Sequence, residues 1–368
     1  MKPQISIVLP TYNGSQYIEK AINSILNQTF QEWELIIVDD CSIDHTYEII
    51  KKYVSLDSRI CCTRNEDNLK LPKSLNVGFE LSRGKYLTWT SDDNYYHSNA
   101  LEKMYEYLEH YIDIPMVCAD MNIIDEDDKV IRTTSDYDDM RMLYNNCVGA
   151  CFLYRKTVYD KLGGYDADMF LVEDYAYWIR ILCTYGHIGT IDKVLYSYRI
   201  HKQSLTETKK KDISSQLARL RLKNIDWLME RLKINPEELT QIYYEMVMSN
   251  IDTDELKKKM IAQIPELAID DDVPFEKHII IYGAGHYGDI AIDCLDGNIS
   301  YIVDKDLSKI GREKNGIRII SVAQMMSIVT EYHVVVAVGE EKIYEVLKEL
   351  YKNGLDRCTV IQRLMTDL

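Results

Sequence analysis

The first 200 residues alternate short β-rich runs with amphipathic helical patterns, and this alternation limits the possible folds more than any other feature of the chain. A helix between two strands returns the chain to the same edge of a sheet, so that successive strands run parallel. The sequence therefore predicts an α/β domain. Its strands are expected at 5–9, 35–39, 59–63 and 86–90, with helices at 17–26, 46–53 and 75–81.

A second part of this domain has a broken pattern, with strands predicted at 116–121, 148–154 and 195–200 and helices at 101–110 and 175–183. The pattern then becomes helical and rich in Lys, Glu and Leu. Pro274 closes this helical stretch and a new strand starts at His278. We therefore expect a catalytic domain at 1–208, a helical connector at 209–275 and a small α/β module at 276–368.

The charge of the chain argues against a nucleic-acid partner. There are 43 Lys and Arg against 59 Asp and Glu, a formal charge of −16, whereas phosphate-backbone binding depends on clustered cations. Nine cysteines without a C-x-x-C pair indicate reduced core thiols, and no apolar run approaches the ~18 residues of a spanning helix. The expected location is the cytoplasm, with peripheral attachment to the inner membrane face and homo-oligomer formation left open.

Three predicted strands end in polar residues that would meet at one sheet edge. Pro10 to Gly14 follow the first strand, Asp39 and Asp40 end the second, and Asp92 and Asp93 follow the fourth. In an open parallel sheet this carboxyl edge is where ligands bind. Each motif alone also fits a turn or a helix cap, but together they favour a site for a nucleotide and a hard cation such as Mg²⁺ or Mn²⁺.

The motifs resemble those of the inverting family 2 glycosyltransferases of the GT-A fold, over about residues 1–205. The resemblance implies a mixed, Rossmann-like sheet and transfer of a sugar from a nucleotide-sugar donor. It is carried by ISIVLPTYNG at 5–14, VDDCSIDHT at 38–46, GKYLTWTSDD at 84–93 and VEDYAYWIR at 172–180.

The resemblance assigns the donor side of the site. Pro10 and Tyr12 would line the base pocket, with the Tyr12 ring stacked near a uracil whose N–H is accepted by Asp40. Asp93 would bind the metal under the diphosphate, with Asp92 beside it near the ribose and the donor sugar. Thr90 stands where many relatives have an acid, which leaves the metal with one protein carboxylate rather than two.

The acceptor side is assigned in the same way. Inversion needs a carboxylate that takes the proton of the attacking hydroxyl. The resemblance implies Asp174 as this base and Glu173 as a supporting acid. It also places His201 at the metal or diphosphate, with Arg199 bracing it, and brings Lys73 within reach of the diphosphate. The alternative for Lys73 is a solvated surface lysine, and the alternative for His201 is a purely structural histidine.

The C-terminal module carries a second nucleotide motif. A strand from His278 runs into G-x-G-x-x-G, formed by Gly283, Gly285 and Gly288, and Asp304 ends the next strand. The stretch resembles small nucleotide-binding modules of bacterial sugar-modifying enzymes. About 93 residues make one mononucleotide half, so full NAD chemistry is not expected. Two roles of the module remain open. It could bind a nucleotide in a ligand-binding, regulatory or docking role, or it could be purely structural.

The sequence as a whole favours a glycosyltransferase that uses Mn²⁺ or Mg²⁺, a UDP-sugar donor, and a surface glycan or lipid-linked glycan as acceptor. Two alternatives stay open. A nucleotidyltransferase would need a basic, glycine-rich triphosphate loop, and 10–14 has no Lys or Arg. A non-catalytic sugar-nucleotide sensor would use the C-terminal module as its binder.

Overall fold

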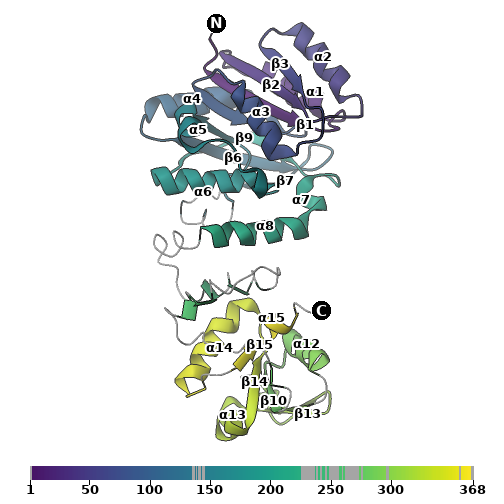
Figure 1. The fold of residues 1–368 in the computed structure, drawn as a ribbon, viewed down its shortest axis with the longest axis vertical. Helices are drawn as coiled ribbons and strands as arrows, with labels where there is room; N and C mark the ends of the chain where they lie inside the picture. The colour runs from purple at the N-terminus through teal and green to yellow at the C-terminus, as the bar shows by residue number, and fades with distance from the viewer. Residues whose placement is uncertain are drawn as a thin grey trace. The chain divides into compact units, whose positions relative to one another are not determined.

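The computed structural model describes residues 2–134, 137, 139, 142, 146–224, 237, 239–240, 243–244, 247, 257–258, 260–261, 273–274, 277–295, 298–355 and 358–365. The chain divides into two compact units, Met1–Gln216 and Leu217–Leu368 (Figure 1). The start of the predicted connector is helical, with α7 at Leu205–Thr208 and α8 at Lys210–Lys223. Most of 225–276 lies outside the described residues, so the boundary near 275 stays a prediction.

The N-terminal unit holds a nine-stranded sheet in the order β3-β2-β1-β4-β8-β6-β9-β5, with β7 paired to β6. The first four strands are parallel, as expected from the alternating pattern. They are β1 (Ile5–Thr11), β2 (Trp33–Asp39), β3 (Ile60–Arg64) and β4 (Tyr86–Trp89), and the helices between and after them are α1 (Ile18–Leu26), α2 (Thr46–Leu56), α3 (Leu71–Glu80) and α4 (Ala100–His110).

The second half of this sheet is mixed, because β8 runs antiparallel to both β4 and β6 while β6 and β9 are parallel. Its strands are β5 (Tyr95–Tyr96), β6 (Met116–Ile124), β7 (Val130–Thr134), β8 (Phe152–Arg155) and β9 (Gly189–Arg199), and its helices are α5 (Lys156–Leu162), the short η2 (Ala167–Met169) and α6 (Glu173–Tyr185). The density of acids in 120–139 predicts exposed loops, but this run contains the β6–β7 hairpin. The expectation failed because β7 is exposed on both faces and lacks an apolar alternation.

Helices cover both faces of the sheet. On one face, α1, α2 and α4 pack their apolar sides onto a buried cluster that includes Ile7, Leu9 and Leu35. On the other, α3 lies close against β1 and β2, where a Cβ at Gly78 would stand 2.4 Å from the Val8 side chain. This layered packing fixes the strand ends, and with them the loops at the carboxyl edge.

The C-terminal unit is a second α/β layer, with the strand order β12-β13-β11-β10-β14-β15 and every pair parallel except β12 with β13. The predicted α/β class is therefore confirmed for both units. Its elements are β10 (His278–Tyr282), α12 (His286–Cys294), β11 (Ile299–Val303), β12 (Glu313–Lys314), β13 (Ile317–Ile320), α13 (Val322–Ile328), η4 (Val329–Glu331), β14 (Tyr332–Val336), α14 (Glu340–Lys352), β15 (Cys358–Val360) and α15 (Ile361–Leu364).

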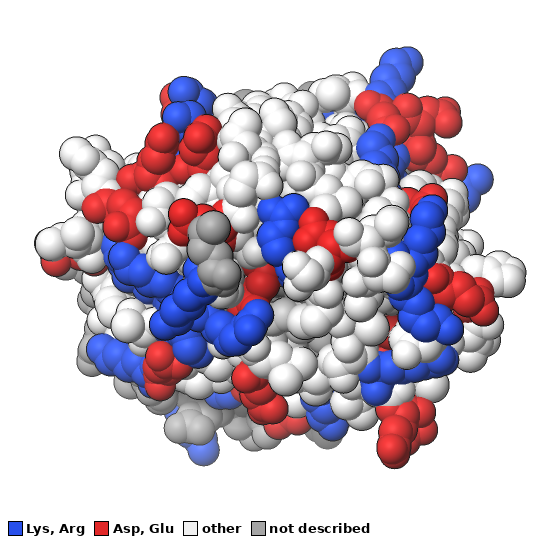
Figure 2. Space-filling model, turned by 90° about the horizontal axis from the view of Figure 1, so that it is seen from above, with Lys and Arg blue, Asp and Glu red and all other residues white. Residues whose placement is uncertain are grey.

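The face seen from above in Figure 2 carries charges of both signs. On the face seen in Figure 2, Lys and Arg are interspersed with Asp and Glu rather than gathered into one field. Within the described residues no helix is both long and apolar enough to cross a membrane. The expected core position of the cysteines holds for Cys118, Cys151 and Cys358, whereas Cys61 is exposed on the edge strand β3.

Candidate active site at the carboxyl edge of the sheet

The loops after β1 and β2 are joined to each other at the carboxyl edge. Asn13, with a left-handed φ of 57°, accepts the Ile43 N–H on Oδ1 at 2.9 Å and donates its own N–H to Ser42 Oγ at 3.0 Å. Pro10 is buried within β1, while the Tyr12 side chain is 48% exposed. Tyr12 thus presents a ring at the edge, as a wall for a stacked base requires.

Asp40 is almost fully buried and holds the loop that follows β3. Its carboxylate accepts hydrogen bonds from Asn65 Nδ2 at 2.7 Å, the Leu69 N–H at 2.8 Å and the Lys70 N–H at 2.9 Å. Three of about four acceptor positions of a carboxylate are therefore occupied, and one is left for the predicted base contact. Lys73 lies in the first turn of α3 and is exposed, so its reach to a diphosphate stays a prediction.

Asp92 is packed against the loop after β1. Thr11 Oγ1 donates to Asp92 Oδ2, and a Cβ built on Gly14 would lie only 2.0 Å from the same oxygen. Removal from water, together with the charge of Asp93 beside it, raises the pKa of Asp92 to about 7. The glycine is thus required by the approach of Asp92, a long-range contact that the turn motif at 10–14 does not reveal.

We expect Gly14→Ala to lower turnover at least tenfold, because the added methyl group must push Asp92 or Thr11 out of place. Overpacking of this kind lowers the free energy of unfolding by about 1–3 kcal/mol, and thermal unfolding measures this loss of stability. Steady-state release of the nucleoside diphosphate measures the loss of turnover. Full turnover in the variant would show that the position of Asp92 is not needed for the reaction.

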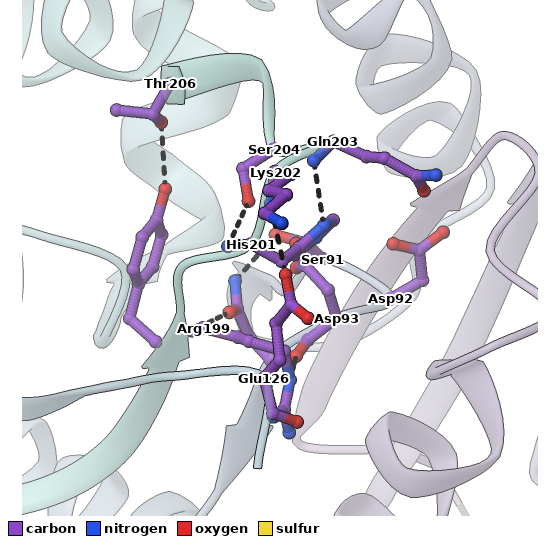
Figure 3. A network of polar contacts seen from close by, with 12 residues as sticks. Ser91, Asp92, Asp93, Glu126, Arg199, His201, Lys202, Gln203, Ser204 and Thr206 are labelled. Atoms are coloured by element: carbon purple, nitrogen blue, oxygen red, sulfur yellow. Dashed lines mark hydrogen bonds and ion pairs between the residues drawn. The ribbon is translucent and has the colours of Figure 1, made fainter. Parts of the chain in front are cut away.

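Asp93 and His201 form the centre of the site (Figure 3). His201 Nε2 lies 3.0 Å from Asp93 Oδ2, and this hydrogen bond raises the pKa of His201. The other ring nitrogen, Nδ1, accepts the Gln203 N–H at 3.3 Å. Both imidazole nitrogens are engaged, and the contact with Asp93 orients that carboxylate. The predicted role of His201 at the metal or the diphosphate stays a prediction.

Arg199 ties the Asp93 loop to the turn between β6 and β7. Its buried guanidinium donates to the main-chain oxygens of Asp93 at 3.1 Å, Asp125 at 2.9 Å and Glu126 at 3.0 Å. It also forms an ion pair with Asp128 at 2.5 Å. Arg199 therefore holds the Asp93 loop against a hairpin turn that was not anticipated, and its predicted bracing of His201 stays a prediction.

The donor atoms at this edge fit a divalent cation that a substrate helps to hold. Asp93 Oδ1 is buried without a hydrogen-bond partner, which leaves a carboxylate oxygen available as a ligand. Among the described residues, no three His, Cys, Asp or Glu side chains converge into a complete protein cage. Mg²⁺ commonly takes one or two carboxylates and completes its shell with substrate phosphates and water. The single protein carboxylate expected from Thr90 stays a prediction.

Asp174 stands at the start of α6, beside a segment that the sequence did not single out. Asn146 Nδ2 donates to Asp174 Oδ2 at 2.8 Å, and the Tyr175 N–H donates to Oδ1 at 2.6 Å. Burial raises the pKa of Asp174. The neighbouring Glu173 accepts the Leu171 N–H at 2.7 Å, and its burial next to Asp174 raises its pKa to about 8.

Tyr198 of β9 connects the two halves of the site electrostatically. Burial raises the pKa of Tyr198, and the charges of both Asp93 and Asp174 add to the rise. Both carboxylates therefore lie within electrostatic range of one phenol, although 81 residues separate them in sequence. The predicted metal residue and the predicted base belong to the same region of the N-terminal unit.

The glycine motif of the C-terminal unit is formed as its spacing predicts. A Cβ at Gly283, which has a φ of +125°, would lie 2.2 Å from the Ala337 oxygen, and one at Gly288 would lie 2.2 Å from the Gly283 oxygen. Gly285 has open space around it. Asp304 accepts the Ala284 N–H at 3.2 Å and pairs with Lys309 at 2.8 Å. These residues are brought together, and a nucleotide bound there stays a prediction.

Comparison with known proteins matches this architecture. The family model for glycosyl transferase family 2 matches residues 6–163. An uncharacterised glycosyltransferase of Haemophilus influenzae is 27% identical over 263 residues, which cover 66% of this chain and 81% of that protein. Asp174 and His201 lie beyond the residues that the family model matches.

Two solved structures share the fold. Residues 1–349 of Staphylococcus aureus TarS in complex with UDP-GlcNAc align with a TM-score of 0.52 and 18% identity over 72% of this chain and 78% of that one. A mannosyltransferase of Pyrobaculum calidifontis with GDP-Man and Mn²⁺ aligns with a TM-score of 0.52 and 14% identity, over 72% and 76%.

The mixed sheet of the N-terminal unit has the GT-A fold of these solved structures. Residues 6–163 match glycosyltransferase family 2, and the similarity to glycosyltransferases supports a transferase that uses a nucleotide-sugar donor. The family resemblance predicted from the sequence motifs is confirmed over these residues. The match also favours sugar transfer over nucleotidyl transfer.

Proposed function

We propose that this protein is a metal-dependent, inverting glycosyltransferase that moves a sugar from a UDP-sugar to a hydroxyl of a surface glycan or lipid-linked glycan. The observation that carries the proposal is the buried, partner-free Asp93 oxygen at the carboxyl edge of the sheet, together with the Asp174 carboxylate held by Asn146 and by the start of α6. The Asp93 carboxylate suits the donor diphosphate and its cation, and the Asp174 carboxylate suits the acceptor hydroxyl. The acceptor class rests on the resemblance of the sequence motifs.

In the proposed reaction Asp174 takes the proton of the acceptor hydroxyl while the hydroxyl oxygen bonds to the anomeric carbon. The bond from that carbon to the β-phosphate oxygen breaks at the same time, and UDP leaves from the opposite face of the sugar. Asp93 would hold the cation, which when bound would supply positive charge to offset the charge that develops on the diphosphate. His201 and Arg199 keep the Asp93 carboxylate in place throughout, and Asn146 orients the carboxylate of the base.

Asp40 supports uracil as the donor base. Its carboxylate has one acceptor position left after the bonds from Asn65, Leu69 and Lys70. Uracil offers a single imide N–H and fits one remaining position. Guanine offers an N–H and an amino group side by side, and would leave one of these donors without a partner, which costs about 1–3 kcal/mol when buried.

We expect UDP to bind at least tenfold more tightly than GDP, a difference of about 1.4 kcal/mol or more, in calorimetric titrations with Mn²⁺. In Asn65→Ala, Asp40 regains an acceptor position, and the preference for UDP over GDP should narrow. Equal binding of UDP and GDP by the intact chain would contradict the assignment of Asp40 to the base.

A further inference from the structure

We propose that Asn76 is a positioning residue for the catalytic base: it fixes the 162–165 turn between the donor half of the site and the helix that carries Asp174. The inference deepens the proposed function and rests on Asp174 as the base. Both ends of the Asn76 amide bond to Tyr165 rather than to Asp92, Asp93 or Asp174. The sequence motifs give Asn76 no role in catalysis.

The first step is the contact itself. Asn76 Nδ2 donates to the Tyr165 carbonyl at 2.8 Å, and Asn76 Oδ1 accepts the Tyr165 N–H at 2.7 Å. One amide side chain therefore satisfies both main-chain groups of a loop residue 89 positions away. A Cβ at Gly164 would lie 2.4 Å from Asn76 Oδ1, so the glycine before Tyr165 is what allows the side chain this close.

The second step is that the same turn is held from the other side by α6. Arg180 donates to the Gly164 carbonyl at 2.6 Å and to the Leu162 carbonyl at 3.2 Å. The turn thus lies between α3, which supplies Asn76, and α6, which begins at Glu173 and Asp174. Any shift of the turn away from Asn76 would disturb the contacts that the turn makes with Arg180 of α6.

The third step is the Tyr165 ring, which connects to both carboxylate regions. It stacks on Phe79 of α3 at 5.7 Å between ring centroids and on Tyr177 of α6 at 4.5 Å. Its hydroxyl accepts a hydrogen bond from Trp89 Nε1 at 3.0 Å. Trp89 ends β4, three residues before Asp92, and Tyr177 lies one turn beyond Asp174. The Tyr165 side chain therefore joins β4, through Trp89, to α6, through Tyr177. Asn76 fixes the backbone of Tyr165.

The position of a base relative to the attacking oxygen strongly affects rate, since misplacement by about 1 Å can cost 10²-fold. Donor binding depends on the loops after β1 and β2 and on the Asp93 loop, which Arg199 and His201 hold through contacts of their own. Loss of the Asn76 contacts should therefore lower kcat and leave donor binding unchanged. This separation distinguishes positioning of the base from general damage to the fold.

The test compares Asn76→Ala and the isosteric Asn76→Asp with the intact chain. Asn76→Asp keeps the acceptor for the Tyr165 N–H but sets a carboxylate oxygen against the Tyr165 carbonyl. The readouts are UDP release with water as acceptor, using the fastest of UDP-glucose, UDP-galactose and UDP-GlcNAc, and the Kd of UDP with Mn²⁺. Asn23→Ala is the control, because Asn23 Nδ2 links α1 to α2 through the Tyr53 hydroxyl at 3.0 Å.

Both Asn76 variants should lose at least tenfold in kcat with the Kd of UDP unchanged within twofold, and Asn23→Ala should keep its kcat. Hydrogen exchange of a 160–175 peptide should become faster in the Asn76 variants only. If either folded Asn76 variant keeps the kcat of the intact chain, or loses UDP affinity in proportion to rate, the inference is wrong. Asp174→Asn in the same assay separates the two proposals. If this variant keeps its turnover, Asp174 is not the general base, whereas the contacts by which Asn76 fixes the 162–165 turn are unaffected by that result.

Discussion

Asp174→Asn is expected to abolish sugar transfer while the Kd of UDP stays within twofold of that of the intact chain. The amide keeps the size of the side chain and can still accept the Tyr175 N–H, but it cannot take a proton. Removal of a general base typically lowers the rate by about 10²- to 10⁴-fold. Turnover with a UDP-sugar panel and calorimetric UDP binding measure the two effects separately.

Asp168→Asn serves as the matched control, since Asp168 is an exposed acid on the same connection, six residues earlier. The pH profile adds a second readout. Burial raises the pKa of Asp174 above its ordinary value of 3.8, so the rate should fall as the pH drops through that raised pKa. Asp174 is not the general base if the rate of the intact chain falls only at or below pH 3.8. The same conclusion follows if Asp174→Asn still transfers sugar.

Local patterns were enough to predict the strand ends that carry Asp40, Asp92 and Asp93. Each lies directly after a buried apolar run, and the topology of a parallel sheet then brings the three loops to one edge. The same reasoning placed Asp174 at a helix start. The family motifs added the chemical roles, which strand periodicity alone does not contain.

Contacts between distant segments were not predictable in the same way. Nothing local to Asn146 indicates that its amide meets Asp174, and Asp128 meets Arg199 only because the β6–β7 hairpin bends to the Asp93 loop. That hairpin itself was missed, since Val130 and Ile131 are more than half exposed and the surrounding acids suggest a loop. Polar side chains that bridge elements leave no periodic signal, whereas buried strands do.

Asp93→Ala is expected to remove the effect of Mn²⁺ on UDP binding. In the intact chain Mn²⁺ should strengthen UDP binding at least tenfold, about 1.4 kcal/mol, because the cation joins the diphosphate to the Asp93 carboxylate. The variant loses that protein ligand and also leaves His201 without its acceptor. Calorimetric titration of UDP with and without Mn²⁺ gives the four affinities needed.

Asp127→Ala is the control, since Asp127 is an exposed acid in the β6–β7 turn near the same loop, and it should keep the Mn²⁺ effect. UDP binding that depends on neither Mn²⁺ nor Asp93 would contradict the metal assignment. It would direct attention to the glycine loop at Gly283 to Gly288, whose fold is formed and whose ligand is open. A Mn²⁺ effect lost only in Asp93→Ala would instead locate the donor diphosphate at the end of β4, with Asp174 left to activate the acceptor.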